Sequence, residues 1–420
     1  MWDGLRWWVG TPSMETVARR AMRAIEALGA TNLVFDEKRG VIQCEVGGSL
    51  SMMSLGNLFA DVRRAPRLQR DRVIRRFVQA VMAPVGQELP ASYEQARARL
   101  VPIVRTQSDD AFGVLSAERL SSAGDGDTGG RMAARAIAGE LIVGIAFDSP
   151  QAMQRITAER LARWGVSLDQ ALDDAAQNLR AMPEHGGWRS LGGGLWSGEW
   201  GDSYESSRLL LPDLIHRLGV ADPVVLAPLR HTLLVASARN ESALATMAVA
   251  ARELIEGHTR WLSLQPLALG ADGWQVFELP RAVRPAFDDL QCIEQASTYA
   301  EQKILLEEIH ERRGIDLFVA DASVVRRHEN GLLCSFCVWS QGVDALLPRA
   351  ALVVFHRATV DADGGGHEPL VVRWDDALEI AGALMAPTGH VPPRWRVNAF
   401  PDAAQWSRLK AVETSMAPLA

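Results

Sequence analysis

The stretch SLDQALDDAAQNLRAM at residues 167–182 is followed closely by GGWRSLGGGLWSGEWG at residues 186–201. In the first stretch, apolar side chains recur every three or four residues behind Ser167 and Gln170, which match a helix-capping box. In the second stretch, Trp and Leu alternate around glycines, which is typical of a hairpin turned by glycine. A helix beside an antiparallel hairpin predicts an α+β fold.

The same mixture of helices and short strands covers the first two thirds of the chain. Met14 to Leu28 has helical spacing up to Gly29, and residues 67–82 form a second predicted helix. Asn240 is expected to cap a third helix. The predicted strands are short runs bounded by turn residues, and they cover residues 33–35, 41–46, 50–53, 100–105, 139–147, 224–227 and 232–236.

Pro280 and Pro285 interrupt this pattern and predict a domain boundary. We therefore expect two modules, residues 1–284 with a sub-boundary near 85–100, and residues 285–420. Both modules are expected to be α+β, with antiparallel or mixed sheets covered by helices. The elements predicted in the C-terminal module are helices at 293–313 and 375–385 and strands at 317–320, 332–339, 352–356 and 370–374.

Composition narrows the class of protein. The chain has 420 residues, of which 48% are hydrophobic and 23% charged, as in ordinary globular proteins. Its longest apolar stretch, residues 141–147, is far shorter than the roughly 20 residues that span a bilayer, and no secretory leader pattern precedes it. Four cysteines suit a reducing compartment, and the net charge of −7 argues against extensive nucleic-acid binding. We expect a soluble, cytoplasmic protein that does not contact membranes.

Familiar catalytic and cofactor motifs do not occur in the sequence. It contains no Walker loop, no nucleophile elbow, no paired metalloprotease histidines and no dinucleotide fingerprint. Cys334 and Cys337 have the spacing of half a zinc site, but Cys44 and Cys292 stand alone and supply no second half. We expect Cys334 and Cys337 to be buried thiols, and we expect no metal and no cofactor.

One basic segment stands out. Residues 63–76 contain seven arginines and a single acid, Asp71. Arg63, Arg67 and Arg70 are spaced to share one helical face, which could hold a phosphate backbone or an acidic partner. The alternative is a solvated outer face without a specific partner.

A polar segment follows the tryptophan-rich hairpin. It reads DSYESSR from Asp202 to Arg208 and combines a carboxylate, a phenol, hydroxyls and an arginine. Such a group could orient a ligand or transfer a proton. The alternative is structural: Asp202 or Ser203 caps the next helix while Arg208 pairs with a nearby carboxylate.

Several stretches together resemble the YtpQ-like family of bacterial proteins. They are LVPIVR at 100–105, AQNL at 176–179, the segment from Asp202 to Leu210, and APLR at 227–230 with LLV at 233–235 and Arg239-Asn240. The resemblance spans about residues 10–280. The segment at 114–138 looks longer than in short members, and residues 285–420 lie outside it.

The family has no established activity, so the resemblance implies positions of interest and no reaction. These are the recurring polar positions Arg105, Asn178, Asp202, Tyr204, Arg208, Arg230 and Asn240. We expect Arg105, Asp202, Tyr204 and Arg208 to converge on one surface cleft.

The sequence is compatible with three functions. The first is a non-catalytic binding or adaptor protein that recognises a protein partner, in part through the tryptophans at 188–200. The second is an enzyme that acts on a small anionic substrate, with Arg105, Arg208 and Arg230 as anchors and Asp202 or Tyr204 in proton transfer. The third and weakest is nucleic-acid contact through the arginines at 63–76. The sequence leaves catalysis itself open.

Overall fold

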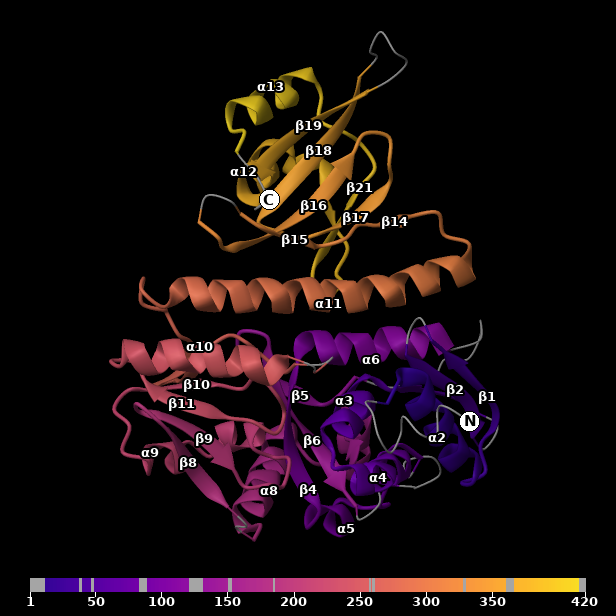
Figure 1. Ribbon diagram of the computed structural model, residues 1–420, viewed down its shortest axis with the longest axis vertical. Helices are drawn as coiled ribbons and strands as arrows, with labels where there is room; N and C mark the ends of the chain where they lie inside the picture. Colours follow the sequence, from indigo (N-terminus) through magenta and orange to yellow (C-terminus); the bar gives the residue numbers. More distant parts are fainter. Residues whose placement is uncertain are drawn as a thin grey trace.

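A 30-residue helix, α11 (Arg284–Arg313), crosses the molecule between two groups of sheets (Figure 1). It begins with Pro285 in its first turn and ends at Gly314, whose φ of 63° is left-handed. The computed structural model describes residues 12–37, 40–46, 49–82, 89–120, 131–149, 153–183, 186–256, 258, 261–327, 330–359 and 366–414. Among these residues, no helix is long and apolar enough to span a membrane.

Below α11 in Figure 1, the N-terminal part of the chain forms a small sheet with helices and a core of its own. The Ser13 side chain accepts a hydrogen bond from the backbone N–H of Thr16 and starts the first helix. Leu28, predicted on the inner face, is instead half exposed, because the helix ends before it. The elements are α2 (Met14–Glu26), β1 (Thr31–Asp36), β2 (Val41–Val46), β3 (Ser49–Ser54), α3 (Gly56–Arg64), η1 (Arg67–Gln69) and α4 (Arg70–Met82), with sheet order β1-β2-β3.

The next segment forms an antiparallel sheet in the order β4-β6-β5, with β7 also paired to β6. Its central strands are buried along nearly their whole length, and the α8 helix covers β4. As predicted, the Ser167 side chain caps α8 by accepting from the N–H of Gln170. The elements are α5 (Tyr93–Arg97), β4 (Leu100–Thr106), α6 (Gln107–Leu120), β5 (Ala134–Ala138), β6 (Leu141–Asp148), β7 (Met153–Arg155), α7 (Ala158–Trp164) and α8 (Leu168–Ala181).

A six-stranded sheet in the order β13-β12-β10-β11-β9-β8 completes the lower group. Both predicted hairpins, at 186–201 and 224–236, are present in it. The Asn240 side chain caps α10 as predicted, and α10 packs on β9 and β11. The elements are β8 (Gly187–Gly192), β9 (Leu195–Glu199), η2 (Ser206–Leu210), α9 (Pro212–His216), β10 (Pro223–Leu226), β11 (Leu234–Ser237), α10 (Glu241–Ile255), β12 (Leu267–Gly270) and β13 (Gly273–Val276).

Above α11 lie two four-stranded sheets, in the orders β14-β17-β21-β20 and β15-β16-β18-β19. The pairs β14–β17 and β16–β18 are parallel and the other pairs are antiparallel, so both sheets are mixed. The elements are β14 (Phe318–Val319), β15 (Ser323–Arg326), β16 (Leu333–Ser340), β17 (Ala345–Pro348), β18 (Leu352–Thr359), β19 (Gly366–Arg373), α12 (Trp374–Ala381), η3 (Gly382–Leu384), β20 (Ala386–Pro387), β21 (Arg394–Val397) and α13 (Ala403–Ala411).

These layers confirm the predicted α+β class with antiparallel and mixed sheets. The boundary predicted near 280–285 coincides with the first turn of α11. The helix belongs to both sides of that boundary: Phe287 and Leu290 pack into the core of the lower group, while Leu306 packs with Val319 and Leu346 of the upper group. The division into two modules therefore stays a prediction, and the described residues show α11 as a shared element.

Candidate functional site

The polar segment after β9 is held by its own ion pair. Arg208 donates two hydrogen bonds to the Asp202 carboxylate, at 3.0 and 2.7 Å, and its guanidinium lies 4.1 Å from the centroid of the Trp200 ring. The Tyr204 hydroxyl donates to Asp148 at 2.8 Å, and the Tyr204 N–H donates to Asp202 at 2.9 Å. Burial opposes the ionisation of Asp202, but the bonds from Arg208 and Tyr204 outweigh it and lower the Asp202 pKa.

Arg105 lies near this segment, at the end of β4. Its Nη1 donates to the carbonyl of Val104 at 2.7 Å, while its Nε has no hydrogen-bond partner among the described residues. Burial, together with the charges of Arg230 and Arg155, lowers the pKa of Arg105 to about 9. Arg230 is itself paired with Asp109 at 3.1 Å. Within the described part of the chain, the ion pair of Arg230 with Asp109 is the one that balances these three arginines.

The structure brings five of the seven predicted site residues into one connected group. Arg105 and Tyr204 are close enough for each to affect the pKa of the other. Arg208 and Tyr204 are buried, at 3% and 6% exposure, so this group is not the open surface cleft that the sequence predicts. The five are Arg105, Asp202, Tyr204, Arg208 and Arg230.

The other two predicted positions make structural hydrogen bonds elsewhere. Asn178 donates from its side-chain amide to the carbonyls of Arg97 and Leu100, at 2.8 and 2.9 Å, and so fixes the entry into β4. Asn240 caps α10 and donates to the carbonyl of Gly193 at 2.9 Å. Both side chains use their polar atoms to hold backbone in place.

The basic patch differs from the expectation of one exposed helical face. Arg63 lies at the end of α3 and stacks on Phe59, with its guanidinium 5.5 Å from the ring centroid. Arg67 lies in η1, while Arg70 begins α4 and is buried at 6% exposure. Because Pro66 separates α3 from η1, the three arginines sit on three elements.

The tryptophans of the β8–β9 hairpin pack inward. Trp188 and Trp200 form an edge-to-face pair with centroids 5.0 Å apart, and the Trp188 indole N–H donates to the Leu214 carbonyl. Trp196 packs against the core of the six-stranded sheet. These rings therefore fill the fold, and they do not form the exposed binding face considered from the sequence.

The hydrogen bond of the Tyr204 hydroxyl provides a test that the polar group around Asp202 stabilises the fold. Tyr204→Phe should lower the free energy of unfolding by about 1.5 kcal/mol, because the partly buried Asp148 carboxylate loses a hydrogen-bond donor. Tyr93→Phe is the matched control, since Asp174 keeps its ion pair with Arg97 and the loss should be smaller. Denaturant unfolding measures both, and equal losses would contradict the assignment.

A cavity of about 600 Å³ lies along α11 and is lined by residues of both groups of sheets. A volume of this size is in the range of small-molecule sites. Its lower wall is made by the start of α6, the Glu140 turn and residues 261–265, and its upper wall by residues 333–335, 349–351 and 392–393. Residues 288–301 of α11 run along it.

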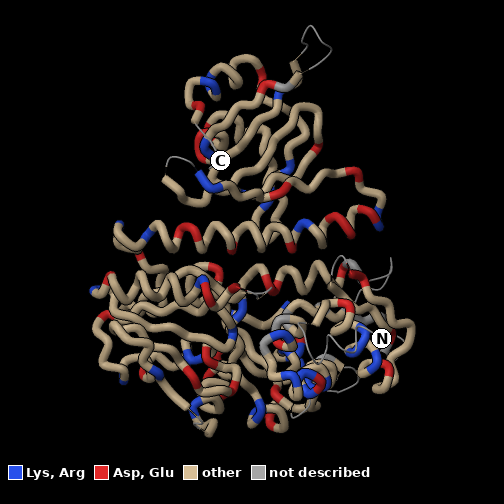
Figure 2. Tube along the Cα trace, in the orientation of Figure 1, with Lys and Arg blue, Asp and Glu red and all other residues tan. Residues whose placement is uncertain are grey.

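Carboxylates dominate the charge of this cavity. Burial raises the pKa of Glu294 from 4.5 to about 8, and the nearby charge of Glu140 adds to the rise, although the Leu264 N–H donates to Glu294 at 3.1 Å. Partial desolvation by the surrounding protein also raises the pKa of Glu140 and of Asp288, although both residues keep an exposed side. Figure 2 shows acidic positions recurring along α11. The cavity therefore opposes further negative charge.

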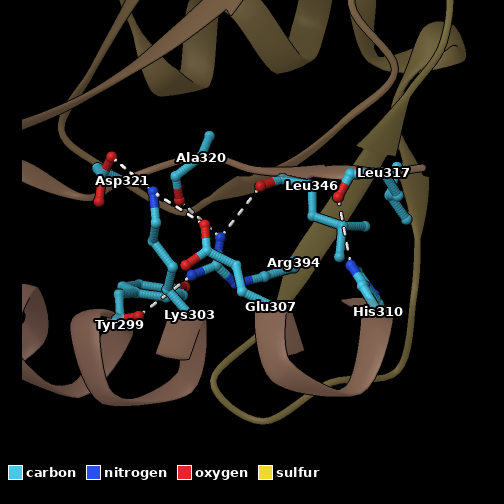
Figure 3. A network of polar contacts seen from close by, with 9 residues as sticks. All are labelled: Tyr299, Lys303, Glu307, His310, Leu317, Ala320, Asp321, Leu346 and Arg394. Atoms are coloured by element: carbon cyan, nitrogen blue, oxygen red, sulfur yellow. Dashed lines mark hydrogen bonds and ion pairs between the residues drawn. The ribbon is translucent and has the colours of Figure 1, made fainter. Parts of the chain in front are cut away.

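The wall toward the upper sheets is held by one buried arginine (Figure 3). Arg394 is 1% exposed and donates to the Gln302 side chain at 2.6 Å and to the carbonyls of Ala320, Leu346 and Tyr299 at 2.8, 3.0 and 3.2 Å. Burial lowers its pKa to about 10. Arg394 thus ties α11 to β14, β17 and β21 and fixes the adjacent cavity wall.

Comparison with known families, with curated proteins and with solved structures finds no match. The resemblance to the YtpQ-like family therefore stays a prediction, and the site has to be argued from its own geometry. The cavity was missed from the sequence because its lining comes from seven separate segments. One signal was available: α11 carries Asp288, Gln291, Gln295 and Thr298 at helical spacing, which places a polar stripe on a helix enclosed by two groups of sheets.

Proposed function

We propose that this protein is a binding protein whose ligand occupies the cavity along α11, without turnover. The observation that carries this proposal is the position of the cavity. A ligand there contacts the lower group through residues 261–265, the upper group through residues 333–335, and α11 along residues 288–301. Binding would stabilise the arrangement of both groups of sheets, because only that arrangement forms the whole site.

The side chains in the cavity favour binding over covalent catalysis. Burial raises the pKa of the Cys292 thiol to about 11 and also raises the pKa of the Cys334 thiol. Both thiols are therefore protonated at neutral pH. The Ser335 hydroxyl donates to Gln295 at 3.4 Å and accepts from the Ala351 N–H at 2.9 Å. No histidine is among the described lining residues. An activated nucleophile beside a base is the usual requirement for covalent catalysis.

One observation supports the anionic-substrate alternative. Arg105 has an Nε without a described partner and lies near Arg155 and Arg230, so an anion at this place would relieve the repulsion between three cations. Asp109, which pairs with Arg230, also lines the cavity. We keep this anion site as a second candidate that the same experiment distinguishes from the first.

Ser297 offers a way to fill the cavity. Ser297 and Ala300 are both exposed on α11, but only Ser297 lines the cavity. Native mass spectrometry of the full chain, incubated with the small-molecule fraction of a cell extract, should show a bound mass on the unchanged chain. Ser297→Trp should lose that mass because the indole takes its space, and Ala300→Trp should keep it.

Three other results would each change the proposed function in a different way. A mass that persists in Ser297→Trp but is lost in Arg155→Met would favour the anion site at Arg105. A chain that retains no molecule in any form would count against the binding role. Turnover of a retained molecule into a product would replace binding by catalysis.

A further inference from the structure

The charges in the cavity are unequal. The described lining includes five acids and one base, Arg349. Arg349 lies 3.9 Å from Asp375, which does not line the cavity, and both side chains are largely exposed. Asp109 is paired with Arg230. The other lining acids are Glu140, Asp288, Glu294 and Glu301.

Glu294 is partly buried, whereas Glu140 and Asp288, two other acids of the cavity, are exposed. Glu294 lies on α11, and its carboxylate accepts one hydrogen bond from the described residues, from the backbone N–H of Leu264. Glu140 approaches from the turn after β5, and Asp288 and Cys292 lie on the same helix. Among the described residues, the charge of Arg284 lowers the pKa of Asp288 from a distance, and no cation contributes to the pKa of Glu140 or Glu294. An ionised Glu294 therefore lacks a compensating charge that a buried carboxylate ordinarily has.

We propose that the cavity takes an organic cation, an ammonium or guanidinium group that ion-pairs with Glu294. This inference rests on the proposed binding function and names its ligand class. Trp261 and Phe112 also line the cavity and supply aromatic surface for the carbon skeleton or the cation face of such a ligand. Gln265, Gln291 and Gln295 supply side-chain carbonyls that accept from its remaining N–H groups.

The spread of the acids suits an elongated organic ion. Glu140 belongs to the lower group and Asp288 and Glu294 to α11, and among the described residues no three His, Cys, Asp or Glu side chains gather as a metal ion requires. Glu140 and Asp288 are exposed and lie at the edge of the cavity. They would attract a cation toward Glu294.

The same chemistry has two sources: a free amine, or a Lys or Arg side chain of a partner peptide. Calorimetric titration of the full chain distinguishes them with two sets of probes. The free probes are 1,5-diaminopentane and agmatine, and the peptide-type probe is lysine blocked at both its amino and carboxyl ends. 1,5-Pentanediol and glutarate are the neutral and anionic controls of similar length.

Glu294→Gln is the diagnostic variant, and Glu278→Gln is its control because Glu278 is exposed and outside the cavity. A cationic probe should bind the unchanged chain and Glu278→Gln with similar affinity. Its affinity for Glu294→Gln should be lower by about tenfold or more. Binding at pH 7 should release a proton, because Glu294 is largely protonated when free and ionised beside a cation. Titration in two buffers of different ionisation enthalpy measures this release, which Glu294→Gln should abolish.

Several titratable groups near Glu294 bear on the proton count. They are Glu140, Asp288, Asp109, Cys292 and Cys334, and the comparison with Glu294→Gln removes their common contribution. Binding of the blocked lysine alone would assign the cation to a partner peptide, and binding of the free amines would assign it to a small molecule.

Failure of every cationic probe, or equal binding to Glu294→Gln, would overturn the inference. Binding of pentanediol or glutarate that is lost in Ser297→Trp would also overturn it, while leaving the proposed binding function intact. Loss of binding of all probes together with retention of no molecule from cell extract would count against both.

Discussion

Arg394→Met should lower the free energy of unfolding by about 3–5 kcal/mol. The substitution keeps most of the apolar stem but removes the donor to the Gln302 oxygen and to the carbonyls of Ala320, Leu346 and Tyr299. Of these, the Leu346 carbonyl still accepts from the Ala320 N–H at 3.1 Å. Each such group costs about 1–3 kcal/mol when it loses its partner, and some relax toward water. Denaturant unfolding of the full chain measures the loss.

Arg396→Met is the matched control on the same strand. Arg396 makes two hydrogen bonds to Asp344, at 2.9 and 2.6 Å, but both side chains are substantially exposed. Exposed ion pairs contribute only about 0–1 kcal/mol, so the control should change little. If Arg394→Met does not fold, Arg394→Lys should give a measurable intermediate loss. Equal small losses for positions 394 and 396 would contradict the role of Arg394.

The second large effect concerns the pH dependence of stability. The pKa of Glu294 is raised from 4.5 to about 8 in the folded chain, so the folded state holds this proton more tightly than the unfolded state. The contribution of Glu294 to the free energy of unfolding is therefore fully present below pH 4.5 and is lost as the pH rises through 8. The loss is about 2–4 kcal/mol, less than the full shift implies because solvent reaches the cavity.

Glu294→Gln should remove this slope and stabilise the chain at high pH relative to the unchanged protein. The difference between the two unfolding curves from pH 5 to 9 isolates Glu294 from other titrating groups. Glu278→Gln should leave the curve unchanged, because Glu278 is exposed on the surface. A slope that persists in Glu294→Gln would show that Glu294 is not the buried acid of this cavity.

Elements whose signals lie within a few neighbouring residues were predicted well from the sequence. The caps at Ser167 and Asn240 and the glycine turn at 192–194 are encoded within a few residues, and the structure contains all of them. Strands such as β12 and β17 were missed, because four residues show little periodicity and their pairing comes from distant segments. The α6 helix was missed because its apolar residues do not gather on one face.

The candidate site was likewise predicted only where its signals are local in the sequence. The polar chemistry of residues 202–208 is visible in the sequence, and the structure shows that Asp202 and Arg208 satisfy each other. Whether a polar cluster is free or paired depends on side-chain geometry that spacing does not encode. Glu294 is unremarkable in the sequence, since a single acid in a long charged helix is usually solvated. Its environment arises only when Leu264 and Glu140, both distant in the chain, close around it.

Hydrogen–deuterium exchange of the full chain, with and without 1,5-diaminopentane, tests most directly that a cation binds along α11. The amine should slow exchange in three segments that line the cavity, residues 261–265, 288–301 and 333–335, and the protection should disappear in Glu294→Gln. Protection confined to the neighbourhood of Arg105 and Arg230, or no protection at any segment, would contradict the assignment of the cavity as a cation site.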